Sequence, residues 1–204
     1  MPMPEQLFRR HDESADAQFY ESPRLVTHIE DVTIAGVTQL YREVLPPGGA
    51  VLDLMSSWVS HLPTEMEFSH VAGLGMNRRE LEANPRLSDF VVHDLNANPV
   101  LPFEDGAFDA ILCCVSVQYL TRPVAVMRDA ARVARSGAPL VITFSNRCFP
   151  TKAVMAWQML DDNGHLDLVE SYLQNAGGWE HIEKLNRTPR GSREPLLAVV
   201  ARKI

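Results

Sequence analysis

Short apolar runs alternate along the chain with stretches whose apolar residues recur every three or four positions. Runs of the first kind predict buried strands, whereas stretches of the second kind predict amphipathic helices. The predicted strands cover residues 50–54, 70–74, 90–93, 108–115, 139–144, 179–185 and 195–201. The predicted helices cover residues 24–44, 77–83, 123–135, 152–160 and 165–176.

The order of these elements predicts an α/β fold, because regular alternation of strands and helices builds a mostly parallel sheet. The run FDAILCCV over residues 108–115 is almost entirely apolar, as expected for a strand that is covered on both faces. The last two strands are joined only by the turn TPRGSRE, so they predict an antiparallel hairpin. We therefore expect a single Rossmann-like, doubly wound sheet of seven strands, mostly parallel, that ends in this hairpin.

The chain has 204 residues, which suits a single domain over residues 19–204. Residues 1–18 are polar and contain proline, so we expect them to be flexible. A formal net charge of −7 without a cluster of Lys and Arg argues against nucleic acids and anionic membranes as partners. No apolar run reaches the roughly 20 residues that span a bilayer.

The cysteines and histidines show no pattern of a metal site. Cys113, Cys114 and Cys148 lack the paired spacing of a disulfide framework or a zinc site. The seven histidines also lack the spacings typical of metal ligands. We therefore expect no metal, and a reducing cytoplasm is the simplest location for the chain.

Three segments carry a resemblance to a known family. VLDL at 51–54 resembles its first strand, and HDLNANPVLPFEDGAFDAIL at 93–112 resembles the stretch from its third strand into its fourth. Residues 117–144 resemble the helix and the fifth strand that follow. The family is the class I S-adenosylmethionine-dependent methyltransferases (methyltransferase-11-like). The resemblance implies S-adenosylmethionine as the cofactor and transfer of its methyl group to an acceptor.

In open α/β sheets, ligands bind beyond the carboxyl ends of the strands, where the strand order reverses. Loops at residues 55–60, 75–79, 94–98 and 115–120 reach this edge of the predicted sheet. Within them, the resemblance gives Asp94 the role of binding the adenine. The residues that the resemblance assigns to the cofactor are Asp53, Met55, Ser56, Ser57, Gly73, Gly75, Asn77, Asp94, Leu95 and Val115.

The first of these loops departs from the family pattern. Where the family has a glycine-rich turn, residues 55–57 of this chain read Met-Ser-Ser. The family also ends its second strand with an acidic residue that binds the ribose, and here that position is Gly75. We expect Asn77 to bind the ribose instead.

Loss of these glycines need not prevent cofactor binding. Glycine is required only where φ is positive or where a Cβ would collide with the ligand. We expect Gly73 and Gly75 to make the room that the first loop no longer provides. We also expect the cofactor's carboxylate to meet the amides of a helix N-terminus that Ser56 or Ser57 caps.

Polar residues at the same edge are candidates for the acceptor site. They are Tyr20, Ser116, Gln118, Tyr119, Asn146 and Arg147. Asn146 and Arg147 suit an anionic or carbonyl group, and His28 and His61 are further residues that could face the cleft. Without a basic surface or a DPPY-like motif, the sequence favours a small-molecule acceptor. In-line methyl transfer depends mainly on alignment and on exclusion of water, and no residue pattern indicates a catalytic base.

Two other interpretations stay open. The altered first loop is also compatible with a catalytically inactive, methyltransferase-like binding or scaffold protein. The second is a Rossmann-type domain that binds a different ligand. NAD fits poorly, because GLGMNR at 73–78 lacks the third glycine of a dinucleotide motif and follows the second strand rather than the first.

Overall fold

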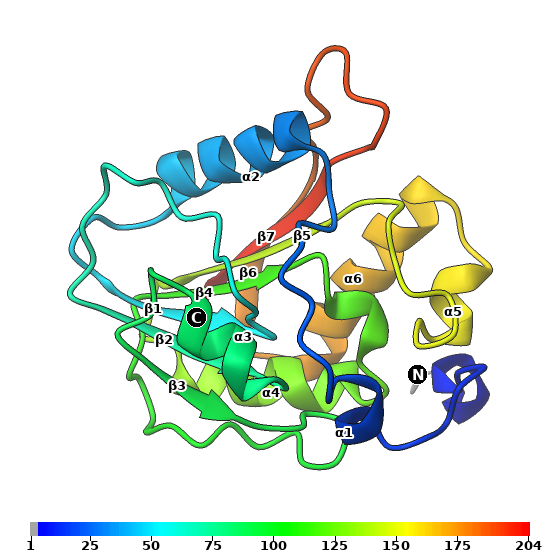
Figure 1. Cartoon of the computed structure of the whole chain (residues 1–204). Helices are drawn as coiled ribbons and strands as arrows, with labels where there is room; N and C mark the ends of the chain where they lie inside the picture. The colour runs from blue at the N-terminus through cyan, green and yellow to red at the C-terminus, as the bar shows by residue number, and fades with distance from the viewer. Residues whose placement is uncertain (1–3) are drawn as a thin grey trace.

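A computed structural model describes residues 4–204 and shows seven strands in one mixed sheet (Figure 1). The strand order is β3-β2-β1-β4-β5-β7-β6. The strands are β1 Ala50–Leu54, β2 His70–Gly75, β3 Asp89–Val92, β4 Ala110–Cys114, β5 Pro139–Phe144, β6 Trp179–Asn186 and β7 Leu197–Lys203. The first five strands pair in parallel, whereas β7 is antiparallel to β5 and β6. The predicted fold, with its C-terminal hairpin, is confirmed.

Helices cover both faces of the sheet. They are η1 Glu5–Phe8, α1 Asp16–Phe19, α2 Asp31–Val44, α3 Arg78–Ala83, η2 Val117–Tyr119, α4 Pro123–Val133, α5 Met155–Gln158 and α6 Asp162–Ala176. Successive residues of β1 point to opposite faces, so Val51 joins the α2 side of the core and Leu52 joins the α4 and α6 side. None of the helices in residues 4–204 is long and apolar enough to cross a membrane.

Local signals set the ends of the two long helices on one face. Pro123 is the first residue of α4, where its missing N–H costs no hydrogen bond. The side chain of Asp161 accepts a hydrogen bond from Gly164 N at 2.9 Å and caps α6, which ends at Gly177 with φ 73°. Of these ends, the Asp161 cap is the one that closes the connection between β5 and α6.

The predicted helix over residues 24–44 begins only at Asp31, and residues 20–30 form an extended strap. Glu80 and Trp58 hold the strap in this form: Arg24 N donates to Glu80 Oε1 at 2.7 Å, and Trp58 Nε1 donates to Val26 O at 3.0 Å. The apolar spacing that predicted a helix is misleading here, because Leu25 and Val26 are exposed. Tertiary hydrogen bonds therefore decide the conformation of this segment.

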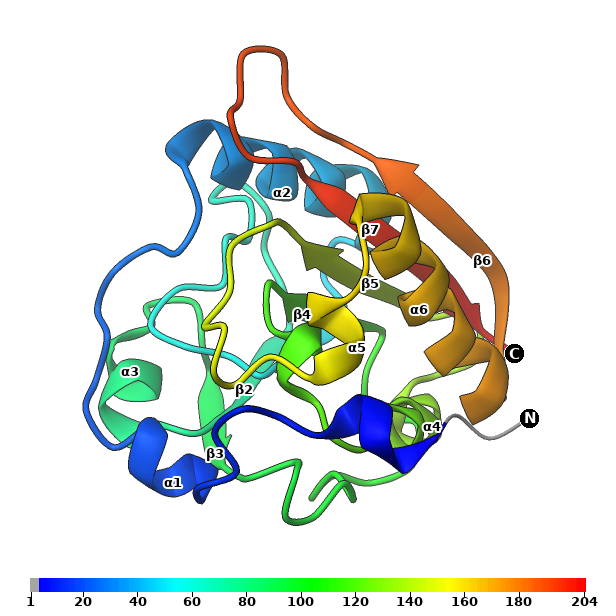
Figure 2. The ribbon, with the colours of Figure 1, turned by 90° about the vertical axis from the view of Figure 1, so that its right-hand side faces the viewer.

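We expected residues 1–18 to be flexible. Residues 1–3 lie outside the described part, but residues 4–18 are tied to the rest of the chain. Asp12 N donates to Thr151 O at 2.9 Å, and Met155 N donates to Arg9 O at 2.8 Å. Figure 2 shows this segment crossing from the side of α4 to α1, after which the strap rises past α3 to α2.

Candidate functional site

A cavity of about 440 Å³ lies at the carboxyl ends of the parallel strands. It is lined by the strap, the loop after β1, the end of β2 with the start of α3, and the loops after β3, β4 and β5. The sheet order reverses between β1 and β4, so this is the place where an open α/β sheet binds its ligand.

Most of the residues predicted from the sequence meet in this cavity. Those of the cofactor set that line it are Asp53, Met55, Ser56, Ser57, Gly75, Asn77, Asp94, Leu95 and Val115. Those of the acceptor set that line it are Tyr20, Ser116, Tyr119 and Arg147. Three predicted residues lie outside the lining, namely Gly73, Gln118 and Asn146.

The loop after β1 keeps a glycine-type conformation without glycine. Met55 has φ 60°, in the left-handed region that side chains rarely adopt. Hydroxyl groups of Ser56 and Ser60 both donate to Asp53 Oδ2 at 2.6 Å, beneath the loop. Asp53 is only 3% exposed, and burial raises its pKa to about 6 although the two hydroxyls oppose the change. A strained residue beside a buried carboxylate is typical of functional sites.

Gly75 makes room for protein rather than for a ligand. A Cβ at this position would collide with the carbonyl oxygen of Ser56. Ser56 N also donates to Leu74 O at 2.8 Å, so the first loop is joined to the end of β2. An acidic side chain cannot stand at residue 75 while this loop lies so close. Our expectation that Gly75 replaces the lost glycines is therefore corrected.

Gly73 serves the core. A Cβ on Gly73 would collide with the side chain of Leu87, which packs over β2. Since Gly73 lies outside the cavity lining, its assignment to the cofactor is corrected as well.

No helix follows β1. Residues 55–69 connect β1 to the parallel strand β2 as an irregular loop, although such crossovers usually contain a helix. Ser56 and Ser57 therefore cap no helix, and Ser57 Oγ donates instead to Glu80 Oε2 at 2.7 Å. The expected helix N-terminus for a ligand carboxylate is absent from this loop.

Asn77 is occupied by other partners. Its Oδ1 caps α3 by accepting from the amides of Arg79 and Glu80 at 2.9 and 3.2 Å. Its Nδ2 donates to the carbonyls of Tyr20 and Glu21 at 2.8 and 3.0 Å. The side chain lines the cavity but is only 8% exposed, and its role in place of the ribose-binding acid stays a prediction.

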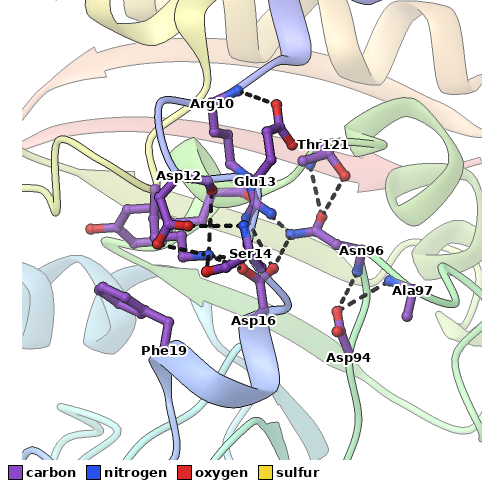
Figure 3. Close-up of polar contacts among 12 residues, drawn as sticks. Arg10, Asp12, Glu13, Ser14, Asp16, Phe19, Asp94, Asn96, Ala97 and Thr121 are labelled. Atoms are coloured by element: carbon purple, nitrogen blue, oxygen red, sulfur yellow. Dashed lines mark hydrogen bonds and ion pairs between the residues drawn. The ribbon is translucent and has the colours of Figure 1, made fainter.

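Asp94 keeps one oxygen available. Its Oδ1 accepts from the amides of Asn96 and Ala97 at 2.9 and 3.1 Å, whereas Oδ2 receives no hydrogen bond from the described residues (Figure 3). The turn thus orients a carboxylate at the cavity wall with free acceptor capacity.

Asn96 joins this wall to the N-terminal segment. Its Nδ2 donates to Asp16 Oδ2 at 2.8 Å and to Tyr119 O at 3.0 Å, while its Oδ1 accepts from the amide and hydroxyl of Thr121 (Figure 3). Asp16 is also paired with Arg10 at 2.8 Å and with Lys152 at 3.2 Å. Lys152 is fully buried, so a network of buried charges fixes the N-terminal segment beside the cavity.

The loop after β4 contains a second strained residue. Val115 has φ 43°, which is rare for a β-branched side chain. Gln118 is fully buried and its Nε2 donates to Val115 O at 2.9 Å. Gln118 therefore supports the conformation of Val115 and does not reach the cavity, while Asn146 is exposed outside it. Both assignments to the acceptor site are corrected.

The remaining wall comes from the strap and the loop after β5. The Arg24 guanidinium lies over the rings of Phe19 and Phe149, at 4.5 and 5.2 Å from their centroids. His28 packs edge-on against Phe149, and burial lowers its pKa, helped by the charges of Arg24 and Arg147 and opposed by Glu80. His61 also lines the cavity, and burial lowers its pKa to about 4, which leaves a neutral imidazole at neutral pH.

Comparison with known proteins agrees with this arrangement. Residues 59–142 match a family model described as a methyltransferase domain. The matched stretch, from the loop after β1 into β5, is similar to a methyltransferase domain. No curated protein sequence matches the chain.

Solved structures with the same fold are distant in sequence. A putative S-adenosylmethionine-dependent methyltransferase from Listeria monocytogenes has a TM-score of 0.61 at 14% identity, over 86% of this chain and 100% of that chain. Phosphoethanolamine N-methyltransferase 2 from Haemonchus contortus, in complex with S-adenosyl-L-methionine, has a TM-score of 0.60 at 14% identity, over 83% and 52%. The [4+2]-cyclase SpnF has a TM-score of 0.60 at 18% identity, over 82% and 79%. At such identities the likeness establishes the fold alone.

The site contains residues that sequence reasoning missed. Glu80, Arg24 and Asn96 all contribute to the cavity wall. Glu80 looks like an ordinary helix residue, and Arg24 lies in a segment that was predicted to be helical. Asn96 lies within the loop 94–98 that was predicted to reach the site, but nothing in its type or spacing indicates a link to Asp16.

Proposed function

We propose that this protein binds S-adenosylmethionine in the cavity and transfers its methyl group, by in-line displacement, to a small-molecule acceptor. The observation that carries this proposal is the charge of the cavity at the sheet's switch point. Its walls include the carboxyl groups of Asp16, Asp53, Glu80 and Asp94, which outnumber the guanidinium groups of Arg24 and Arg147.

The negative charge of the cavity favours a cationic cofactor over one that carries phosphates. S-adenosylmethionine carries a sulfonium and an ammonium group, so a wall rich in carboxylates attracts it. A dinucleotide carries phosphates, which those carboxylates repel. The residues present therefore fit S-adenosylmethionine better than NAD.

Named residues divide the cavity between parts of the cofactor. The free Oδ2 of Asp94 suits the amino group of an adenine, with Leu95 beside it. Met76, Gly75, Met55 and Val115 also line the cavity, and we expect the first two to contact the ribose and the last two to contact the methionine moiety. Bound S-adenosylmethionine supplies a methyl group that is activated by the sulfonium.

The strap side of the cavity suits the acceptor. Tyr20, Tyr119 and Arg147 line the cavity, and its volume of about 440 Å³ favours a small molecule. The chain's contribution is to orient the acceptor and to exclude water.

Binding is tested by titrating S-adenosylmethionine and S-adenosylhomocysteine into the protein and into Asp94→Ala. Asp89→Ala is the matched control, because Asp89 is exposed at the start of β3 and lies outside the cavity. We expect micromolar binding that Asp94→Ala weakens at least tenfold and Asp89→Ala leaves unchanged. No binding of either ligand at millimolar concentration would contradict the proposal and favour a site for another ligand.

Catalysis is tested with methyl-labelled S-adenosylmethionine and a cell extract separated into low-mass and macromolecular fractions. Transfer of label into the low-mass fraction is expected. Label in the macromolecular fraction would contradict a small acceptor, and tight binding without transfer to either fraction would favour the inactive scaffold.

A further inference from the structure

The cofactor's methionine carboxylate lacks its expected partner in this fold. No helix follows β1, so residues 55–69 offer no helix N-terminus to an anion. The backbone amide of Ser56 already donates to Leu74 O in β2 at 2.8 Å. Another group must therefore balance a carboxylate bound here, and an isolated anion in a closed cavity is strongly disfavoured.

Arg24 has the properties that this role requires. Its guanidinium rests against Phe19, Tyr20 and Phe149, at 4.5, 5.8 and 5.2 Å from the ring centroids. Nη2 donates to Phe19 O at 2.9 Å, whereas Nη1 is buried and finds no acceptor among the described residues. No carboxylate of residues 4–204 lies within ion-pair distance of Arg24. A buried donor of a charged group is rarely left unpaired without a functional reason.

The carboxylates that line the cavity do not compete for Arg24. Asp53 accepts from two serine hydroxyls, and Asp16 is paired with Arg10 and Lys152. Glu80 accepts from the backbone amide of Arg24 at 2.7 Å, which fixes the strap while leaving the guanidinium unpaired. The Arg24 guanidinium therefore has no carboxylate partner among residues 4–204, and its Nη1 stays without an acceptor there.

Arg147 is the other arginine of the cavity, and it is less suited. Its Nε lies 3.3 Å from Glu194 Oε1, so it already has a carboxylate partner. Its side chain is 63% exposed, which weakens any interaction with an anion through solvent screening.

We propose that Arg24 binds the carboxylate of the cofactor's methionine moiety, in place of the missing helix N-terminus. This inference rests on the proposed binding of S-adenosylmethionine. The same chemistry could serve a carboxylate on the acceptor, and the experiment below separates the two sources.

The test compares two ligands that differ at this group. S-adenosylhomocysteine has the amino-acid carboxylate, whereas 5′-methylthioadenosine lacks it. Both are titrated into the unmodified protein and into Arg24→Gln, Arg24→Lys and Arg147→Gln. We expect Arg24→Gln to weaken S-adenosylhomocysteine on the order of 10-fold to 100-fold and 5′-methylthioadenosine less than about threefold. Arg24→Lys retains part of the affinity, and Arg147→Gln changes neither ligand.

Other outcomes overturn the inference in distinguishable ways. If Arg24→Gln lowered the affinity for both ligands equally, Arg24 would only support the strap. In a second outcome, Arg24→Gln leaves the affinity for S-adenosylhomocysteine unchanged but abolishes binding of benzoate to the S-adenosylhomocysteine complex. That result would assign Arg24 to an acceptor carboxylate. Loss in Arg147→Gln alone would assign the cofactor carboxylate to Arg147. If the unmodified protein binds neither nucleoside, the proposed function itself fails.

Discussion

Ser56 and Gly75 are in backbone contact at the centre of the candidate site. The carbonyl of Ser56 occupies the space that a side chain at residue 75 would need, and Ser56 N donates to Leu74 O at 2.8 Å. The two departures from the family pattern, a first loop without glycine and a second strand without its acid, are therefore one structural change. The loop lies where the acidic side chain would otherwise stand.

Gly75→Ala should displace the first loop. The added methyl group meets a backbone carbonyl, which cannot rotate away as a side chain can. We expect the free energy of unfolding to fall by about 2 kcal/mol or more, and S-adenosylhomocysteine affinity to fall with it. Urea unfolding and calorimetric titration measure the two effects.

Gly73→Ala is the matched control for Gly75→Ala. Its methyl group meets the end of the Leu87 side chain, which is only half-buried and can change rotamer. We expect a smaller loss of stability and no loss of ligand affinity. Equal effects of the two substitutions would contradict the assignment of Gly75 to the loop contact.

Asp53 should make stability fall as pH rises. Burial raises its pKa in the folded protein to about 6 from a usual 3.8, so the folded state binds the proton more tightly than the unfolded state. The contribution is fully present below about pH 4 and is lost as pH rises through 6. Its full size corresponds to about 3 kcal/mol.

Asp53→Asn isolates this contribution, because an amide does not titrate. Urea unfolding at pH 4, 5, 6 and 7 should show that the unmodified protein loses stability relative to Asp53→Asn across this range. Parallel curves for the two proteins would mean that Asp53 is not the titrating group.

The sequence predicted the sheet well, because its strands are dense apolar runs that a core must cover. β1 and β5 have the predicted bounds, and β6 and β7 form the predicted hairpin. The strap was mistaken for helix, since Leu25 and Ile29 have helical spacing. Local spacing carries no information on the distant partner Glu80, which holds the strap by hydrogen bonding to Arg24 N.

The sequence predicted which loops form the candidate site, but not which hydrogen bonds their residues make. Asp53, Asp94 and Val115 line the cavity, and they were predicted because they lie at or just after strand ends at one edge of the sheet. Asn77 was given a ligand role because nothing in its own neighbourhood shows that Tyr20 and Glu21 would take its amide. Partners that are far apart in the sequence decide which polar groups remain free.

Glu80 should control both the first loop and the strap. Its two carboxylate oxygens accept from Ser57 Oγ and from Arg24 N, both at 2.7 Å. Glu80→Ala removes both bonds, and we expect a loss of about 2 kcal/mol or more in the free energy of unfolding. S-adenosylhomocysteine affinity should fall as well, because both segments line the cavity.

Glu80→Gln distinguishes hydrogen bonding from charge. The amide oxygen can still accept from Arg24 N, and the amide nitrogen can donate to the Ser57 hydroxyl, which is able to reverse its role. We expect Glu80→Gln to cost about 1 kcal/mol or less. A loss as large as that of Glu80→Ala would show that the charge of Glu80, rather than its two bonds, is required.

Substitution of the buried Lys152 should be among the most destabilising changes to a charged residue of this fold. It is fully buried and bonds Ser14 O at 2.7 Å and the carboxylates of Asp12 and Asp16, each at 3.2 Å. Burial by itself would raise the pKa of Asp16, but hydrogen bonds from Asn96 and Arg10, with the Arg10 charge and Lys152, lower it. Lys152→Met leaves this carboxylate with less compensation, and we expect a loss of about 3–5 kcal/mol.

Lys184→Met is the control for Lys152→Met. Lys184 also pairs with two carboxylates, Asp167 at 2.8 Å and Glu170 at 2.7 Å, but its side chain is 38% exposed. We expect its loss to cost about 1 kcal/mol or less and to shrink further in 1 M salt, whereas the cost of Lys152→Met should persist. Urea unfolding at low and high salt measures both. Because the N-terminal segment brings Asp16 to the cavity wall, Lys152→Met should also weaken S-adenosylhomocysteine, and an unchanged affinity would separate this network from the ligand site.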